Sequence, residues 1–364
     1  MKVEAFLKVE KGDTLGTLRN FLGRLLTEGV VNYLLVPLEI SHGRALAPTL
    51  VKDPARLSQA NPFSPVMPES GAAIVAQLTI DQPGKKLGAV LKPCEIRALV
   101  ELVKLGQASL ENVIIIGTDC LGTLEVEDYA KFIEGMEGAE KGAKVLADMR
   151  QGAKLPISLR PACKMCNVFT PLTSDITLGL FGVKEGVFIS LEDKLAKKLN
   201  LGAREAPERQ KAIEQLAESR SKAREQVFSE FRERTKNIVD FASYLDTCIM
   251  CYACSAACPL CYCRVCFFRT DTFEPESERY YRWADREGAL RMPTEILLYH
   301  LTRLNHVAIS CCGCGMCESA CPRKLPLTTI FQTVGEGLQK ALNYVPGRSV
   351  DEEIPLATIP EVKV

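Results

Sequence analysis

The sequence shows no excess of either charge, because its 364 residues include 45 Lys and Arg and 45 Asp and Glu. It therefore has no general electrostatic attraction for nucleic acid or for an anionic membrane surface, and no basic stripe suggests a nucleic-acid partner. No window approaches the roughly 20 uninterrupted apolar residues of a membrane-spanning helix. Residues 1–13 also lack the apolar core of a secretory signal, so we expect a cytoplasmic protein without a membrane span.

Familiar catalytic motifs are missing as well. The sequence contains no Ser-His-Asp arrangement, no G-x-S-x-G and no H-E-x-x-H. Histidine is rare, and His300 and His306 are expected to cap or pack a helix rather than to bind a metal. These absences leave cysteine as the residue type that stands out.

Cysteine occurs 16 times. In a reducing cytoplasm so many thiols would not persist as structural disulfides, and thiolates this close in sequence indicate metal binding. The alternative is a secreted disulfide scaffold, which would be a shorter chain with a signal peptide. The hydrophobic content of 47% is instead that of a protein with a large core.

Residues 1–183 are expected to form an α/β domain with a mostly parallel sheet. Apolar runs at residues 30–37, 72–80, 87–91 and 113–117 predict strands, and residues 15–26 and 95–105 predict helices. Ligands of such sheets bind beyond the carboxyl ends of the strands. Cys94 and Cys120 each follow a predicted strand, so both should emerge at one edge of the sheet.

The remaining chain divides into three segments. Residues 184–244 predict a helical linker, in which the charge-dense residues 191–236 form one or two surface helices with intrahelical ion pairs. Residues 245–343 are cysteine-rich and include predicted helices at 294–306 and 328–342. Residues 344–364 predict an extended, proline-containing tail along this module or along a partner.

The strongest motif is Cys248-x2-Cys251-x2-Cys254-x3-Cys258-Pro259, repeated as Cys311-x2-Cys314-x2-Cys317-x3-Cys321-Pro322. This is the spacing of bacterial two-cluster ferredoxins, so we expect an α+β ferredoxin-type domain with two 4Fe–4S clusters. In that arrangement each fourth cysteine binds the other cluster. The predicted ligand sets are Cys248, Cys251, Cys254 and Cys321 for one cluster, and Cys311, Cys314, Cys317 and Cys258 for the second.

A pair of four-cysteine zinc sites is the alternative for these two motifs. Zinc knuckles usually pair one C-x2-C with a distant second C-x2-C. Four cysteines in a 2-2-3 spacing followed by proline, twice over, do not follow that pattern.

The first domain carries four further cysteines, Cys94, Cys120, Cys163 and Cys166. Two cysteines at strand ends and one C-x2-C could converge on a third cluster. By spacing alone, a zinc site or separate buried thiols remain equally open, because free cysteine is commonly buried.

A resemblance favours the third cluster. The PCEI stretch at Cys94, the strand-end DC at Cys120, and the CxxC followed by Phe169, Thr170 and residues 174–179 resemble the beta-subunit family of coenzyme F420-reducing hydrogenases and formate dehydrogenases. The resemblance covers roughly residues 10–183, and the cysteine-rich module resembles that of formate dehydrogenase beta subunits. It implies that the four cysteines hold a 4Fe–4S cluster beside FAD, which exchanges hydride with the deazaflavin F420.

The resemblance also implies a role and partners. The chain would be an electron-transfer subunit beside a catalytic redox subunit of formate dehydrogenase, hydrogenase or heterodisulfide-reductase type. A soluble carrier such as F420, NAD(P) or ferredoxin would serve it. The alternative is an adaptor subunit without flavin.

The chain departs from the family near the expected flavin site. Members usually have a Gly-Gly pair there, whereas this chain has Gly16 alone, and a stretch beginning at Asn61 replaces a glycine-and-tyrosine stretch. Lys92, Arg97 and Asn61 are the candidate FAD contacts. Lys92 and Arg97 flank Cys94 where a helix begins, a position that favours anions, although a surface ion pair would explain them equally.

Four cysteines are left over. Cys261, Cys263 and Cys266 could bind an additional metal or could be polarisable packing around a cluster, and the second interpretation is preferred. Cys312 is adjacent to a predicted ligand and is expected not to bind metal.

Overall fold

The computed structural model describes residues 2–10, 12–40, 44–81, 84–136, 141–151, 155–263, 265–273 and 275–355. Its described strands form one seven-stranded sheet in the order β1-β7-β6-β5-β4-β2-β3. The strands are β1 (Lys2–Leu7), β2 (Tyr33–Ile40), β3 (Ala45–Val51), β4 (Leu87–Leu91), β5 (Val113–Thr118), β6 (Ile176–Gly179) and β7 (Val187–Glu192).

The sheet is mixed, so the expectation of a mostly parallel sheet is wrong. Its centre, β2-β4-β5-β6, is parallel, whereas β3, β7 and β1 pair antiparallel at the two sides. β2 and β3 follow each other closely in sequence, as do β6 and β7. Parallel neighbours need a crossover of about a dozen residues or more, so these close neighbours pair antiparallel. With β7, the sheet also continues past the boundary expected at residue 183.

The strand predicted at residues 72–80 is a helix, α2 (Gly71–Thr79). A short apolar run does not distinguish a buried strand from a buried helix. The buried residues of α2 include Ala72, Val75 and Thr79, which recur at helical spacing. The predicted strands at β2, β4 and β5 are confirmed with small shifts. The predicted helices are confirmed as α1 (Thr14–Thr27) and α3 (Pro93–Lys104).

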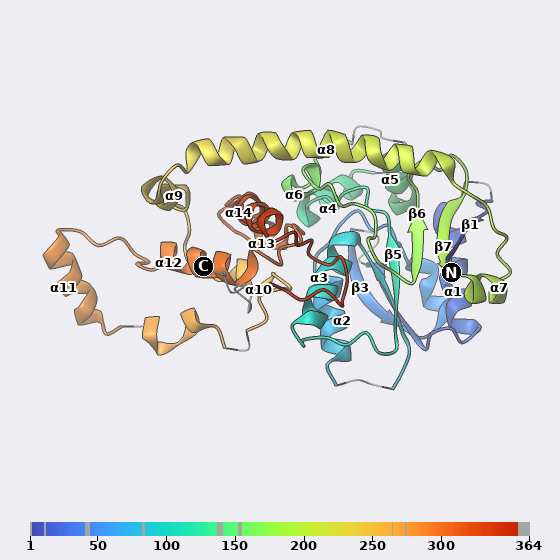
Figure 1. Cartoon of the computed structure of the whole chain (residues 1–364), viewed down its shortest axis with the longest axis horizontal. Coiled ribbons are helices and arrows are strands. Elements are labelled where there is room, and N and C mark those ends of the chain that lie inside the picture. The colour runs from blue at the N-terminus through green and yellow to red at the C-terminus, as the bar shows by residue number, and fades with distance from the viewer. Residues whose placement is uncertain are drawn as a thin grey trace, which may run out of the picture.

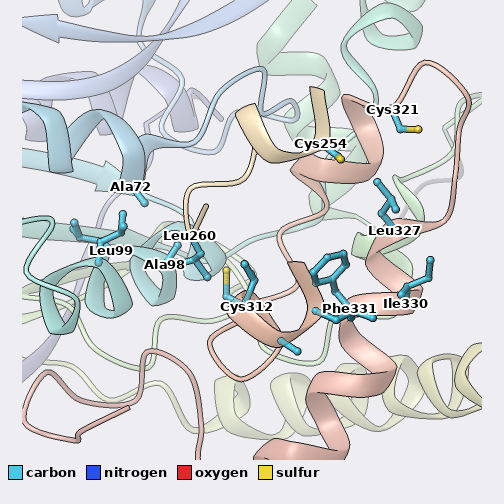
Figure 2. Packing of buried hydrophobic residues seen from close by; sticks show 14 of the residues in the cluster. Ala72, Ala98, Leu99, Cys254, Leu260, Cys312, Cys321, Leu327, Ile330 and Phe331 are labelled. Carbon is cyan, nitrogen blue, oxygen red and sulfur yellow. The ribbon is translucent and has the colours of Figure 1, made fainter. Parts of the chain in front are cut away.

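Helices cover both faces of the sheet. On one face α1 buries Leu18 and Leu22 against strand residues such as Leu34. On the other face α2 and α3 join the sheet to the cysteine-rich part of the chain in a single core. Figure 2 shows Ala98 and Leu99 of α3 beside Leu260 and Cys312. The cysteine-rich module is therefore packed directly on the α/β domain.

The linker contains α7 (Asp193–Lys198) and the long helix α8 (Pro207–Arg234). In Figure 1, α8 runs along the top of the molecule, over the sheet and over the C-terminal helices. Its ion pair Lys222–Glu218 is exposed, as expected of a solvated helix. However, α8 also buries Arg209, Arg220 and Phe228, so it fastens the two parts together as well as connecting them.

Residues 245–343 contain no strand in the ranges that the structure describes, so the expected α+β character is not found there. The chain between the two cysteine runs forms helices, because its buried residues recur at helical spacing, as Ile296, Tyr299, Arg303 and Val307 show. The predicted helices at 294–306 and 328–342 are confirmed as α12 (Ile296–Val307) and α14 (Leu327–Ala341). The other α-helices from residue 238 onward are α9 (Ile238–Tyr244), α10 (Ala253–Ala256), α11 (Ser277–Glu287) and α13 (Met316–Ser319).

The remaining helices lie between these segments. They are α4 (Val126–Glu134), α5 (Lys141–Arg150) and α6 (Pro161–Lys164), with the 3-10 turns η2 (Pro54–Gln59), η3 (Phe267–Arg269) and η4 (Asp271–Phe273). Among the described residues, none of the helices has the length and apolar character needed to cross a membrane.

The tail is described to residue 355, and residues 356–364 lie outside the described ranges. Its first residues turn back onto α3 instead of extending away. Glu101 of α3 is fully buried and accepts hydrogen bonds from Tyr344 Oη at 2.5 Å and from the Gly347 amide at 2.8 Å. The tail is therefore fixed to α3 of the α/β domain.

Candidate metal centres

Four cysteines of the α/β domain line one cavity, and we call them the N-terminal group: Cys94, Cys120, Cys163 and Cys166. Cys94 is in the first turn of α3, directly after Pro93, a residue favoured at the start of a helix. Cys120 follows β5, and the short helix α6 carries Cys163. The carboxyl edge of the parallel strands thus brings Cys94 and Cys120 together, as expected from the topology, and the segment at α6 adds Cys163 and Cys166.

The loop after Cys120 approaches Cys163 closely. The Thr123 amide lies 3.3 Å from Cys163 Sγ and the Thr123 hydroxyl lies 3.1 Å from it. Gly122 has a φ of +105°, and a Cβ there would meet the side chain of Leu159, so glycine is required for this approach. Hydrogen bonds of this kind stabilise a negatively charged sulfur.

Burial opposes negative charge in this cavity. It raises the pKa of Cys94 well above its usual value, and Glu95 and Cys120 add to the effect. Burial also raises the pKa of Cys120 to about 12, with Cys163 as the next cause. Thiolates that raise one another's pKa are stabilised when a metal supplies positive charge between them. The donor set and its electrostatics therefore fit a cationic centre.

A second cavity is lined by Cys248, Cys251, Cys254 and Cys321, which we call the distal group. The first triplet wraps the cavity in a tight loop, in which Met250 and Tyr252 have φ values of 49° and 61°. Polar side chains contact its sulfurs: Arg303 Nη1 donates to Cys254 Sγ at 3.1 Å, and His300 Nε2 lies 3.4 Å from Cys248 Sγ. Burial lowers the pKa of His300 to about 4, and the charge of Arg303 adds to this.

The remaining four motif cysteines, Cys258, Cys311, Cys314 and Cys317, form the middle group. Burial is the first cause of the raised pKa of Cys317, and Cys258, Cys314 and Cys311 follow, so all four lie within electrostatic range of one another. Gly313 and Gly315, with φ values of 69° and 75°, turn the loop tightly around them. The structure thus places Cys258 with the second triplet and Cys321 with the first, as the spacing predicts, and their binding of iron stays a prediction.

The three groups form a row. Cys314 and Gly313 of the middle group also line the cavity of the N-terminal group. The middle group adjoins the distal group at Arg303. This arginine donates a hydrogen bond to Cys254 of the distal group, and its charge lowers the pKa of Cys258 and Cys317 of the middle group against the larger effect of burial. Of the cysteines in the three groups, Cys251 of the distal group is the exposed one.

The candidate FAD contacts are not brought to one place. Lys92 is buried and borders the N-terminal cysteine cavity, where its charge lowers the pKa of Cys120 against the larger effect of burial. Arg97 does not form the surface ion pair offered as the alternative. Its guanidinium donates hydrogen bonds to the carbonyl oxygens of Pro346 at 2.8 Å and Cys312 at 3.0 Å. Asn61 is fully buried, and neither its amide nitrogen nor its amide oxygen has a hydrogen-bond partner.

The remaining cysteines differ in their surroundings. Cys312 is buried and hydrogen-bonded to Cys314, which lowers the pKa of Cys314 to about 7. Cys263 is exposed, whereas Cys261 and Cys266 are partly buried, and Cys261 lies beside Arg303. Within the described ranges, no three His, Cys, Asp or Glu side chains are arranged to hold a single metal ion.

The sequence interpretation missed four buried arginines, one of which, Arg220, donates to the Cys166 carbonyl oxygen. Arg160 and Arg303 lie between cysteine groups, and Arg209 pairs with Asp119 beside Cys120. The one local signal is the position of Arg160, shortly before Cys163. Arg209 stands in a charge-dense helix, where an exposed ion pair is the usual interpretation, whereas Arg303 is the one Lys, Arg, Asp or Glu of α12.

The chain is similar to several known proteins. Residues 84–236 match a family described as the C terminus of the coenzyme F420 hydrogenase/dehydrogenase beta subunit. The chain is 27% identical over 321 residues to the F420-dependent formate dehydrogenase subunit beta of Methanocaldococcus jannaschii, with 79% of each chain covered. It is 27% identical over 385 residues to the F420-dependent formate dehydrogenase 1 subunit beta of Methanococcus maripaludis, with 96% of this chain and 94% of the relative covered.

One solved structure is also similar. It is a xenon derivative of the F420-reducing nickel–iron hydrogenase complex from Methanosarcina barkeri, with a TM-score of 0.46 and 14% identity, covering 65% of this chain and 93% of the other.

Proposed function

Because the chain belongs to the coenzyme F420 hydrogenase/dehydrogenase beta-subunit family, we propose that it is a flavin- and iron–sulfur-containing electron-transfer subunit of a multi-subunit redox complex. The three cysteine groups hold three 4Fe–4S clusters. The protein links hydride chemistry at FAD with one-electron transfer to a catalytic partner of formate dehydrogenase, hydrogenase or heterodisulfide-reductase type. The hydride carrier is F420 or NAD(P), and ferredoxin is the one-electron alternative.

The observation that carries this proposal is the row of three cysteine groups. The N-terminal and middle groups share a cavity wall at Cys314, and Arg303 connects the middle group to the distal group. Neighbouring centres within one core allow electrons to pass without an external carrier. Of the cysteines in the three groups, Cys251 is the exposed one, so the row exchanges electrons with the catalytic partner there.

A flavin at the other end of the row is supported by two separate candidate contacts, Lys92 and Asn61, which do not line one cavity. FAD, when bound, supplies the step between a two-electron hydride and the single electrons that iron–sulfur clusters carry. Lys92 is buried beside Cys120 and provides a positive charge for an anionic group. The buried amide of Asn61 lacks partners for both of its polar atoms, and such atoms usually have a ligand or water.

The alternative, an adaptor without flavin, is favoured by one observation. Gly16, which stands alone where relatives have a glycine pair, lies in the first turn of α1, and its amide bonds the capping side chain of Asp13 at 2.7 Å. A Cβ at Gly16 would collide with that carboxylate. This glycine therefore already has a role in capping α1, without a flavin.

Anaerobic purification and cofactor analysis test both functions. The proposed function predicts iron and acid-labile sulfide for three clusters, at about four of each per cluster, and FAD released on denaturation. Iron and sulfide without flavin would support the adaptor. Zinc in place of iron and sulfide would contradict both. Identification of the subunits that purify with the chain from the native cell would then name the partner.

A further inference from the structure

A buried arginine lies at each of the two junctions between neighbouring cysteine groups. At the first junction, Arg160 Nε donates to the Thr123 hydroxyl at 2.7 Å, and that hydroxyl lies 3.1 Å from Cys163 Sγ of the N-terminal group. The same guanidinium donates to the Cys314 carbonyl oxygen at 3.1 Å and to the Ser319 hydroxyl at 3.2 Å. Arg160 is 3% exposed, so its charge is not screened by water.

At the second junction, Arg303 has the corresponding position. Its Nη1 donates to Cys254 Sγ of the distal group at 3.1 Å, and its Nη2 donates to the Cys254 carbonyl oxygen at 3.2 Å. Cys258 and Cys317 of the middle group also interact with its charge. Arg303 is 4% exposed, and its guanidinium packs over the ring of Phe331 at 4.8 Å. Both guanidinium groups are thus held rigidly.

Other buried cations lie near the cysteines as well: Lys92 borders the cavity of the N-terminal group, and Arg220 and Arg97 bond the backbone. Arg220 donates to the carbonyl oxygens of Cys166 and Leu121, beside the N-terminal group. Arg97 donates to those of Cys312 and Pro346, beside the middle group. The charge of Arg97 also lowers the pKa of Cys166 and of Cys311, but its hydrogen bonds go to carbonyl oxygens. Arg160 and Arg303 differ because each bonds a cysteine sulfur, or the threonine that contacts one, and lies beside the next group.

A buried cation between two clusters has a predictable effect on both. Reduction adds a negative charge to a cluster, so an adjacent fixed positive charge favours the reduced form. A reduced cluster also repels the electron arriving at its neighbour, and a cation between them weakens this repulsion. The effect is largest in a medium of low dielectric constant, which the burial of both side chains provides.

We propose that Arg160 and Arg303 set the relative reduction potentials along the row, each raising the potentials of the two clusters that it joins. This inference rests on the proposed function, because it requires the three clusters. Arg160 acts on the clusters of the N-terminal and middle groups, and Arg303 acts on those of the middle and distal groups. The middle cluster, with a cation on each side, is a stable site for an electron in transit.

The test is an anaerobic redox titration of the full chain, followed by electron paramagnetic resonance. Signals are assigned to groups with Cys163→Ser, which removes the N-terminal cluster, and Cys251→Ser, which removes the distal cluster. Arg160→Gln and Arg303→Gln remove each charge, Arg160→Lys and Arg303→Lys keep it, and Arg232→Gln on the exposed side of α8 is the control.

The expected result is a crossed pattern. Arg160→Gln makes the N-terminal and middle clusters harder to reduce and leaves the distal cluster unchanged, while Arg303→Gln affects the middle and distal clusters only. Each shift is about tenfold in the equilibrium constant for reduction, or ~59 mV for one electron. The Lys variants and Arg232→Gln stay near the wild-type potentials.

Failure of the proposed function and failure of this inference give different results. Wild-type protein without cluster signals contradicts the proposed function. Clusters with unchanged potentials in both Gln variants contradict the inference alone, as do equal shifts of all three clusters, which would indicate general loosening. If a Gln variant does not assemble, the Lys variant decides, because a tenfold shift with the charge retained would show that packing, not charge, sets the potential.

Discussion

The guanidinium of Arg209 bonds both carboxylate oxygens of Asp119, with Nη1–Oδ2 at 2.6 Å and Nη2–Oδ1 at 2.7 Å. Asp119 is fully buried and precedes Cys120, and the same carboxylate accepts the Leu180 amide at 2.8 Å. Arg209 is in the first turn of α8. The pair therefore anchors the long helix to the strand end that carries a predicted ligand.

Replacing Arg209 with Met is expected to destabilise the protein by about 3–5 kcal/mol, because it leaves the Asp119 carboxylate buried without its partner. Chemical denaturation followed by circular dichroism measures the change in the free energy of unfolding. Lys222→Met, which removes an exposed ion pair of the same helix, is the matched control and should change stability by less than about 1 kcal/mol. Equal effects of the two variants would show that the buried pair has no special role.

Cys163→Ser should remove about four iron atoms and leave the other two clusters intact, because Cys163 belongs to the N-terminal group alone. Iron and sulfide analysis of anaerobic protein measures the loss. Cys263→Ser is the control, since Cys263 is exposed and outside the three groups. Unchanged iron in Cys163→Ser would refute the third cluster, and lost iron in Cys263→Ser would point to an additional metal.

Asn61→Ala tests the flavin contact. If the unpaired amide of Asn61 bonds FAD, the variant should lose about 1–3 kcal/mol of flavin affinity, or about 5- to 150-fold, because a buried hydrogen bond is removed. The flavin-to-iron ratio after gel filtration measures this, and iron content should not change. Asn167→Ala is the control, because Asn167 lines a different cavity, beside Gln332 and Glu336 of α14. A stable Asn61→Ala protein with full flavin would place the cofactor elsewhere.

Gly347→Ala should detach the tail from α3. Gly347 has a φ of +75°, and a Cβ there would collide with the backbone and side chain of Arg97. We expect faster hydrogen exchange and proteolysis at residues 344–350, and a loss of about 1–2 kcal/mol from the backbone conformation alone. Gly337→Ala is the control, because a Cβ at Gly337 meets nothing. Unchanged exchange in Gly347→Ala would mean that the tail is not held by this contact.

Parts of the fold were predictable from local pattern. α1 and α3 have clear amphipathic periodicity, and β4 and β5 are continuous apolar runs. The helix α2 was predicted as a strand because its apolar run is short, and a short apolar run does not distinguish a strand from a helix. Its helical state depends on packing against α3. The place of β1 in the sheet likewise depends on tertiary structure, because its partner β7 is distant in sequence.

For the predicted metal sites, too, the sequence determined one part of the arrangement and the tertiary structure determined another. The spacing of the cysteines by itself determined how the triplets and their crossed fourth cysteines group together, because three-residue intervals let a short loop aim its thiols inward. The tertiary structure alone decided that the N-terminal group meets Cys314, that Arg160 and Arg303 lie at the junctions, and that Cys251 faces outward. Those relationships join residues far apart in the chain, and long-range packing leaves no periodic signal in the residues on either side.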